Sequence, residues 1–439
     1  MSIKATGMFR GRSYHGVIQR PIQSASVSVG KYLVVMAVLL YVSVSASLMR
    51  TVGWHYGGGG SSIEKLHPGT YLLVFALAWI AFLEKHFALV ALRTFFRDYA
   101  LVSFTVCAAS TAAFCVLVKE YPVTPFIETF GVTIIVFLIF SLLGEEELKV
   151  FKFFVDTFVI LNIALIFVEY LTQRNFLPAY IYSAASGTEQ PVEIGRPAGL
   201  FGLPLSAAAF LCLYSLVNLI PSIGGQHRGL LRPLLGVISL MAAAMTGARA
   251  ALLGSIAAVL IPLAYAFAMS FIRGVSLRAA IVVLMMALVA LIALVIASEN
   301  GLFDLLLARF ESDRDSALSR YFALQILINM PSEYVWTGGP ADYITQQQQV
   351  YNVLAIEISW VNFVLACGLA FTIPLILTYL LFLFRSVAKH AVFGFVPSIY
   401  VVIVHASALA LWSKSTSFAA SIAVVLAYIG RKGGLRGAG

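Results

Sequence analysis

A chain of 439 residues would ordinarily fold as two or three soluble domains, but its composition excludes that class of protein. Hydrophobic residues make up 60% of the chain and charged residues only 11%, whereas a soluble globular protein carries about 25% charged residues. The formal charge of +9 therefore raises the question of which side of a membrane the basic residues occupy, before any question of a nucleic-acid partner.

The predicted elements are membrane-spanning helices, because a helix needs about 20 predominantly apolar residues to cross the hydrocarbon core of a bilayer. Twelve segments qualify, which predicts an all-α integral membrane protein with about twelve transmembrane helices. In chain order they are residues 32–49, 69–83, 99–118, 125–143, 153–171, 198–220, 231–246, 250–271, 279–297, 355–383, 392–411 and 416–430. The tenth segment is long and contains Pro374, where we expect a tilt or kink. The four cysteines lie in apolar runs and are interpreted as buried side chains, not disulfide partners.

Basic residues orient these spans. Residues 1–31 are polar and basic and no small-residue cleavage site follows the first span, which indicates a retained cytoplasmic tail. When the N-terminus is placed in the cytoplasm, every predicted cytoplasmic segment carries at least two basic residues, in agreement with the positive-inside rule. The C-terminal tail, residues 431–439, is then also cytoplasmic. Spans one to nine occupy residues 32–297, spans ten to twelve occupy residues 355–430, and two long outer segments cover residues 172–197 and 298–354.

Arginines gather on the predicted outer side, where basic residues are disfavoured. They are Arg50, Arg174, Arg196, Arg249, Arg309, Arg314 and Arg320. A guanidinium at a membrane surface is suited to bidentate binding of phosphate or carboxylate. The alternative is that these arginines pair with outer acidic residues. That alternative is weakest for Arg249, because the short connection between two apolar spans that carries it has no acidic residue close in sequence.

The first outer segment, residues 172–197, is rich in turn-forming and aromatic residues. Pro197 suits the first position of the following helix, which would place Arg196 over a helix N-terminus. Backbone N–H groups there would add to an anion site. The alternative is an interfacial arginine whose guanidinium reaches the lipid headgroups.

The second outer segment, residues 298–354, is too long for a simple connection and is expected to fold as a helical lid. Residues 302–310 are amphipathic. Further along, apolar residues recur every three to four positions, which predicts a helix at about 317–330 that carries Arg320 and is stopped by Pro331. Residues 336–340 form a predicted turn.

Four features in order resemble the O-antigen polymerase and O-antigen ligase superfamily, polytopic enzymes that handle lipid-diphosphate-linked sugars on the periplasmic side. They are the stretches Gly195 to Pro204, Thr246 to Gly254, Arg309 to Pro340, and Tyr351 to Gly368. Ligases of this superfamily present a His-Asn pair where this chain has Tyr351-Asn352, which favours the polymerase branch.

The resemblance implies a bacterial inner-membrane polysaccharide polymerase with a periplasmic active site. It would transfer a polyprenyl-diphosphate-linked glycan onto the non-reducing end of a lipid-linked repeat of an exopolysaccharide, capsule or O-antigen. The implied partners are that lipid-linked donor and acceptor, membrane lipid, and chain-length regulator and flippase proteins; no nucleic acid, metal or cofactor is expected. The alternatives are ligase-type transfer to another acceptor, a lipid-linked oligosaccharide flippase or transporter, and a non-catalytic assembly partner. Transporters of the alternating-access type show internal repeats, and none is evident here.

Arginines can neutralise a departing diphosphate without a metal, and Arg196, Arg249 and Arg320 are the candidates. Glu357 is the first candidate for the base that activates the acceptor hydroxyl; pairing with an arginine is its alternative role, and other acidic residues of the large loop stay open. Further candidates for substrate binding are Glu169, Arg174, Arg309, Arg314, Tyr351 and Asn352.

Overall fold

The structure is a computed structural model of the chain. It describes residues 29–54, 56, 65–183, 188–192, 195–223, 230–249, 251–256, 258, 314–351, 356, 358–388, 394–407, 411–412 and 415–429.

The described chain is mostly helical. Up to the first outer segment its elements are α1 (Val29–Ser43), α2 (Ala46–Thr51), α3 (Pro68–Leu83), α4 (Lys85–Arg97), α5 (Tyr99–Leu117), α6 (Thr124–Phe126), the π-helical η1 (Ile127–Gly131), α7 (Val132–Phe140) and α8 (Glu145–Thr172). From that segment onward they are β1 (Ala179–Ser183), β2 (Thr188–Val192), the 3-10 helix η2 (Gly199–Phe201), α9 (Pro204–Ile223), α10 (Leu231–Met245), α14 (Arg314–Ile328), α15 (Ser332–Val335), α16 (Ala341–Val350), α17 (Ser359–Leu381), the π-helical η3 (Phe382–Val387), α18 (Phe395–Ser407) and α19 (Ser417–Tyr428).

Several helices meet the length and apolarity that a membrane crossing needs. Within the described residues these are Tyr99–Leu117, Glu145–Thr172, Pro204–Pro221 and Ser359–Val387, with α3 and α4 together as a bent fifth. Shorter apolar helices lie at Val29–Ser43, Thr124–Phe140, Leu231–Met245, Phe395–His405 and Ser417–Tyr428. The described part of the chain therefore contains four or five helices that are long and apolar enough to span a membrane, and the count of twelve stays a prediction. Of its eighth span, residues 250–271, the structure describes only residues 251–256 and 258, and its ninth span, residues 279–297, lies outside the described residues.

Two helices at the centre of the molecule are apolar around their whole circumference. The hydrophobic stretch of α9 is 83% buried, against 33% for α5 and 28% for α8, and α19 is buried along nearly its full length. A helix that is apolar all round belongs in an interior, whereas α5 and α8 keep apolar faces exposed on the periphery. Exposed apolar faces on peripheral helices are what lipid contact requires.

One partly buried charged cluster joins four of these helices. Asp156 of α8 accepts hydrogen bonds from the hydroxyls of Tyr214 on α9 and Tyr428 on α19, each at 2.6 Å. Arg232 of α10 pairs with the same carboxylate through two nitrogens, each 2.9 Å from an oxygen. We call these four residues the Asp156 cluster. Asp156 therefore connects α8 to α9, α10 and α19.

The segment between the second and third predicted spans is itself a helix. It has the bounds of α4, and α4 is bent by 110° from α3 at Glu84. Its apolar side chains Leu89, Leu92 and Phe96 are exposed and recur every three to four residues, so they share one face. The sequence indicates only a short connection here.

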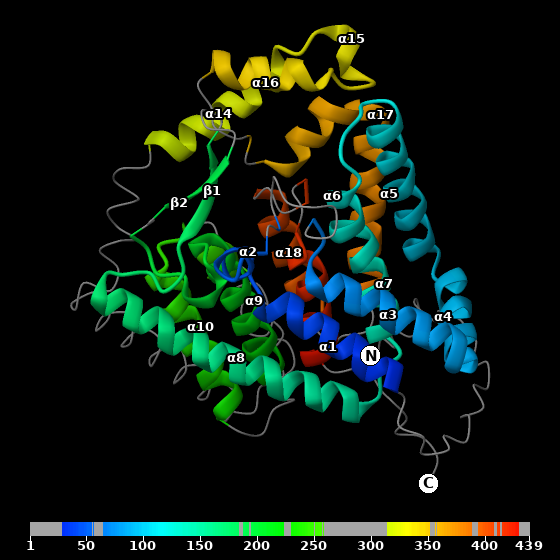
Figure 1. Ribbon diagram of the computed structural model, residues 1–439, viewed down its shortest axis with the longest axis vertical. Helices are drawn as coiled ribbons and strands as arrows, with labels where there is room; N and C mark the ends of the chain where they lie inside the picture. Colours follow the sequence, from blue (N-terminus) through cyan, green and yellow to red (C-terminus); the bar gives the residue numbers. More distant parts are fainter. Residues whose placement is uncertain are drawn as a thin grey trace, which may run out of the picture.

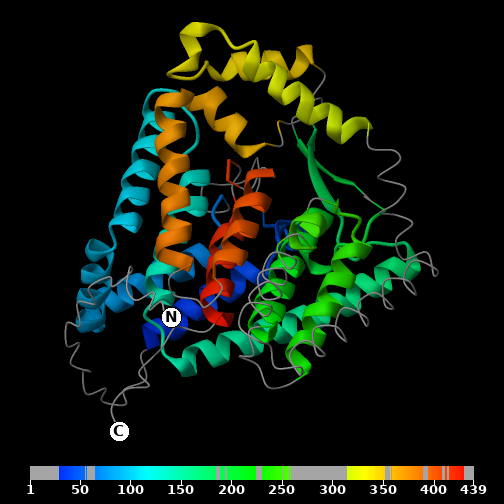
Figure 2. The ribbon, with the colours of Figure 1, turned by 180° about the vertical axis from the view of Figure 1, so that it is seen from behind.

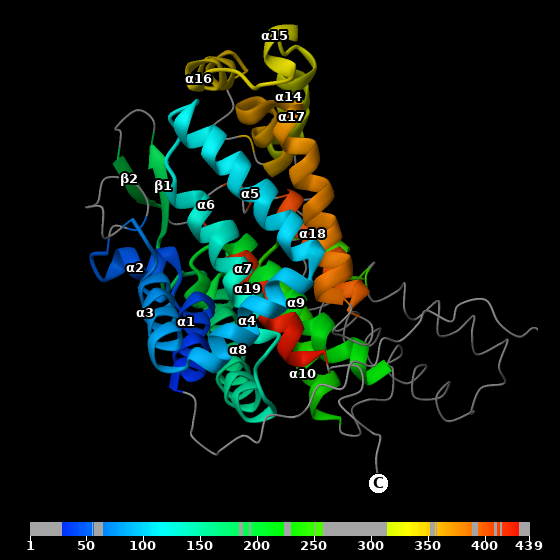
Figure 3. The same cartoon turned by 90° about the vertical axis from the view of Figure 1, so that its right-hand side faces the viewer.

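A helical layer lies across one end of α5 and α17. The layer consists of α14, α15 and α16, residues 314–350, and we call it the lid (Figures 1 and 3). The expected helix at about 317–330 is confirmed and begins three residues earlier, at Arg314. Seen from behind, α17 and α5 again stand side by side beneath the lid (Figure 2).

The helix break in α17 lies at Gly368 (φ 71°, ψ 175°), and Pro374 is accommodated within the helix. A tilt or kink at Pro374 stays a prediction, and the break that the structure shows lies six residues earlier. Glycine is the residue that adopts a positive φ without a steric penalty, so the backbone turns there instead.

Candidate functional site

The first outer segment is more ordered than its composition indicates. It contains an antiparallel hairpin in which β1 pairs with β2, from Ala179 opposite Val192 to Ser183 opposite Thr188. The hairpin stands at the lid end of the molecule in all three views (Figures 1 to 3).

A buried carboxylate fixes the return of this segment into the helical body. Glu169, near the end of α8, is 2% exposed and accepts hydrogen bonds from the backbone N–H groups of Phe176 (2.7 Å), Ala198 (2.6 Å) and Gly199 (2.8 Å). Asn162, two turns earlier, accepts one from Leu200 at 2.9 Å. Glu169 was a candidate for substrate binding, and these contacts make it a residue that positions the loop carrying Arg196.

The sequence predicts that Arg196 lies over a helix N-terminus, and in the structure it does not. Pro197 is not helical, because η2 intervenes and α9 begins only at Pro204. The half-buried Arg196 instead donates a hydrogen bond from Nε to the carbonyl of Thr246 at 2.9 Å. Thr246 is the C-cap of α10, and carbonyl groups at a helix C-terminus attract a cation.

This contact brings together two arginine motifs from separate parts of the chain. After Thr246, Gly247 adopts a positive φ of 67° and turns the backbone, and helical residues resume at Arg249. The helical residues 249 and 251–256 lie at the start of the eighth predicted span, residues 250–271, and the side chain of Arg249 is half-buried. Arg196 thus contacts the short segment that carries Arg249, although 50 residues separate it from Thr246.

The lid carries the third candidate arginine. Arg320 is half-buried on α14, which packs against α17. Tyr351, which follows α16, accepts a hydrogen bond from Nδ2 of Asn329 at 3.1 Å, and its ring lies 5.5 Å from that of Phe322. Arg320 and Tyr351 therefore belong to one folded unit.

Backbone contacts join the lid to the break in α17. Gly339 N–H donates to the carbonyl of Leu365 at 2.8 Å, and Ala370 N–H donates to the carbonyl of Trp336 at 3.2 Å. A Cβ added to Gly368 would lie 2.2 Å from the backbone of Trp336. We call this interlock of residues 336–339 with residues 365–370 the lid clasp. It explains why the break lies at a glycine.

A lysine and a disulfide hold α5 against the lid clasp. Lys119, just after α5, donates to the carbonyl of Gly338 at 2.8 Å, and desolvation lowers the pKa of Lys119 below its ordinary value. Cys115 of α5 forms a disulfide with Cys367, the residue before the helix break. The expectation that no cysteine pairs is therefore wrong for these two, while Cys107 and Cys212 are free thiols.

A second buried carboxylate, that of Glu128 in η1, lies against α3 and the residues that precede α3. Glu128 is fully buried and accepts hydrogen bonds from the Tyr56 hydroxyl, the His67 backbone N–H and the Thr70 hydroxyl. Burial, followed by the Glu128 charge, raises the pKa of Tyr56 well above its ordinary value. An acid within an apolar span signals such a site, but its donors come from segments that sequence reasoning does not connect to it.

The remaining candidates are placed as follows. Arg174 is exposed just beyond the end of α8, after Gln173 in the left-handed conformation, and Arg314 is the first residue of α14. Arg309, Asn352 and Glu357 lie outside the described residues. Among the described residues, no group of three or more His, Cys, Asp or Glu side chains could hold a metal ion.

Comparison with known proteins finds no protein-family model and no curated protein that matches this chain.

Proposed function

We propose that this protein is a membrane-embedded polysaccharide polymerase. It transfers a polyprenyl-diphosphate-linked glycan to the non-reducing hydroxyl of another lipid-linked repeat, at the outer face of a bacterial inner membrane. In this proposal the chain crosses the membrane twelve times with both termini in the cytoplasm. The single observation that carries the proposal is the contact of Arg196 with Thr246, because it gathers two arginines from separate motifs at one place.

The chemistry requires charge neutralisation at the leaving group. The anomeric C–O bond to the diphosphate breaks, the electron pair leaves with polyprenyl diphosphate, and the acceptor oxygen forms the new glycosidic bond to the anomeric carbon. The acceptor proton passes to a base, for which Glu357 is the candidate. Arg196 and Arg249 bind the diphosphate, and Arg320 of the lid adds a third positive charge as the substrate is covered.

The disulfide supports the orientation of this site. Disulfides form and persist in oxidising compartments, and the periplasm is one. Cys115 and Cys367 are bonded at the lid clasp, so the lid and the end of α5 that it contacts belong on the oxidising side. This agrees with the orientation that the positive-inside rule predicts from the basic residues alone.

The test replaces each arginine by lysine, which keeps the charge and loses the bidentate fork. In the native host we expect Arg196→Lys and Arg249→Lys each to lower the amount of long polymer at least about tenfold. A tenfold loss of rate corresponds to a rise of about 1.4 kcal/mol in the activation free energy. Single-repeat lipid-linked glycan should accumulate at the same time. Arg93→Lys on α4, an exposed arginine away from the lid, is the matched control and should give full-length polymer. Protein level in the membrane is measured in parallel.

Full-length polymer from both lysine variants would contradict the proposed site. The leaflet on which the single-repeat glycan accumulates separates the alternatives. Accumulation on the outer leaflet supports a polymerase, whereas accumulation on the inner leaflet identifies a flippase.

A further inference from the structure

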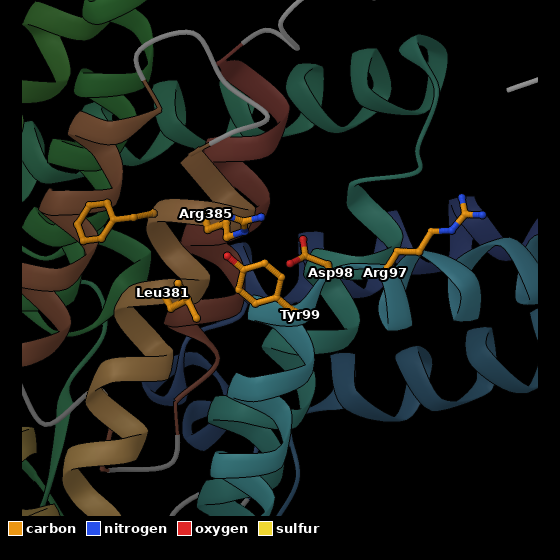
Figure 4. Close-up of a pocket in the computed structure, with 6 residues that line it drawn as sticks. Arg97, Asp98, Tyr99, Leu381 and Arg385 are labelled. Carbon is orange, nitrogen blue, oxygen red and sulfur yellow. The ribbon is translucent and has the colours of Figure 1, made fainter. Parts of the chain in front are cut away.

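A pocket lies at the end of α5 opposite the lid. Its volume is ≈ 540 Å³, and it opens between the α4–α5 junction and the end of α17 (Figure 4). The residues that line it are Arg97, Asp98, Tyr99, Leu381, Phe384 and Arg385. No residue of the proposed glycan site contributes to it.

Two arginines and one aspartate line the pocket, and the two arginine side chains extend in different directions (Figure 4). Arg385 is exposed, and its Cζ lies 4.0 Å from the centre of the Tyr99 ring. Stacking on a ring face fixes a guanidinium and leaves its edge N–H groups available for an anion. Arg97 is also exposed and extends away from Tyr99 at the rim (Figure 4).

The single carboxylate is committed to the scaffold. Asp98 is 9% exposed and accepts hydrogen bonds from the Ser386 hydroxyl at 2.8 Å and from the Leu101 backbone N–H at 3.3 Å. It therefore caps α5 and ties it to η3, and the two arginines determine the charge that the open part of the pocket presents.

An apolar row on α17 leads away from the pocket. Ile373, Leu377 and Leu381 are 45%, 61% and 36% exposed and are spaced four residues apart, so they share one helix face. Leu381 also lines the pocket. A cationic pocket at the end of an exposed apolar row has the two parts that a phospholipid needs, one for the headgroup and one for an acyl chain.

The neighbouring helix has the character of a membrane-surface helix. α4 turns by 110° from α3 and exposes Leu89, Leu92 and Phe96, with Arg93 and Arg97 on the same short helix. A helix with an apolar face and basic side chains lies in the interface between headgroups and acyl chains.

The length of α5 sets the depth of the pocket. Its 19 residues span about 28 Å at 1.5 Å per residue. That is about the thickness of the hydrocarbon core of a bilayer. With the lid clasp at one membrane surface, the pocket lies at the other, at headgroup level.

We propose that this pocket binds an anionic phospholipid from the leaflet opposite the lid. The headgroup phosphate is held by Arg385, Arg97 adds a second positive charge at the rim, and one acyl chain lies along Ile373, Leu377 and Leu381. Anionic lipid thereby supports the junction of α4, α5 and η3. This inference stands independently of the proposed glycan chemistry.

The test uses the full-length protein purified in mild detergent and supplied with equal amounts of dioleoylphosphatidylglycerol and dioleoylphosphatidylcholine. Native mass spectrometry counts the lipids retained. We expect the wild type to retain phosphatidylglycerol in at least about fivefold preference, and Arg97→Gln with Arg385→Gln to lower that preference to near one. Arg93→Gln, on α4 but outside the pocket lining, should keep the wild-type preference.

A second measurement guards against misfolding of the double variant. Arg97→Gln alone changes only an exposed rim side chain, and its melting temperature without lipid should equal that of the wild type. Phosphatidylglycerol should raise the melting temperature of the wild type more than that of Arg97→Gln, and inorganic phosphate should raise neither. The inference is overturned if Arg93→Gln loses the preference equally, if the double variant keeps it, or if inorganic phosphate stabilises as well as the lipid.

Discussion

The lid clasp and the Asp156 cluster tie helices together in opposite ways. At the lid clasp, backbone groups of residues 336–339 meet backbone groups of residues 365–370, and glycine makes that approach possible. In the Asp156 cluster, one carboxylate pairs with a guanidinium and accepts hydrogen bonds from two phenol hydroxyls, and these three groups come from three other helices. The lid clasp is therefore disrupted by adding atoms to a glycine, and the Asp156 cluster by removing the carboxylate. Different substitutions can test the two separately.

The largest effect is expected at the lid clasp. Gly368→Ala places a methyl group against the backbone of Trp336 at a positive φ, and neither conflict is relieved by moving a side chain. We expect a loss of about 4 kcal/mol in the free energy of unfolding, from backbone strain together with the steric clash. Thermal unfolding of the purified protein measures it.

The control for that prediction is Gly53→Ala. Gly53 also has a positive φ, of 83°, but an added Cβ would meet nothing within 4 Å. The control isolates the backbone strain, which costs about 1 kcal/mol. Equal losses in the two variants would show that the lid clasp is not closely packed.

The Asp156 cluster is broken by Asp156→Ala. The change leaves the partly buried guanidinium of Arg232 and the hydroxyls of Tyr214 and Tyr428 without their shared acceptor. We expect the free energy of unfolding to fall by about 3 kcal/mol. This is at the lower end of the range for breaking a buried ion pair, because the side chain of Arg232 is 29% exposed. Lys149→Ala, which removes an exposed ion pair with Glu146, should leave the melting temperature unchanged. A matching fall in both variants would mean that the cluster contributes no more than a surface pair.

The smallest of the three effects is expected from the disulfide. Cys115→Ser should lower the free energy of unfolding by about 2 kcal/mol. This is near the lower end of the range for disulfides, despite the long loop, because apolar helices that persist in the unfolded state already restrict the chain. Dithiothreitol should lower the wild-type melting temperature to that of the variant and leave the variant itself unchanged. Cys107→Ser, at a free thiol of the same helix, is the control and should respond to reductant as the wild type does. A wild type that is indifferent to complete reduction would contradict the prediction.

Local patterns in the sequence predict the local structure well. The second span ends at Leu83 and the helix on the lid is present, because apolar periodicity, Pro331 and neighbouring turn residues act within a few positions. α4 is missed because its apolar residues number too few for a span, although their spacing is helical. The helix start expected at Pro197 is displaced to Pro204 because Gly199 and Gly202 adopt positive φ and shape a 3-10 turn first.

Long-range contacts are what the sequence could not supply. Arg196 and Arg249 are both recognisable as unusual arginines, yet nothing in either motif indicates that Arg196 contacts Thr246. Glu169 is recognisable as an acid at a span end, but its partners are backbone N–H groups, which every residue except proline carries. Cysteine pairing likewise depends on which helices become neighbours.

The Cys115–Cys367 bond also constrains how the protein is made. Its two cysteines are separated by 252 residues. At about 5–20 residues per second, the ribosome needs about 13 to 50 s to reach the second cysteine after the first. In the proposed orientation, Cys115 remains a thiol that faces an oxidising compartment throughout that interval, two helical turns from the thiol of Cys107. The correct pairing therefore requires that Cys115 stay unpaired until Cys367 has been synthesised, and the disulfide secures the lid clasp only after that point.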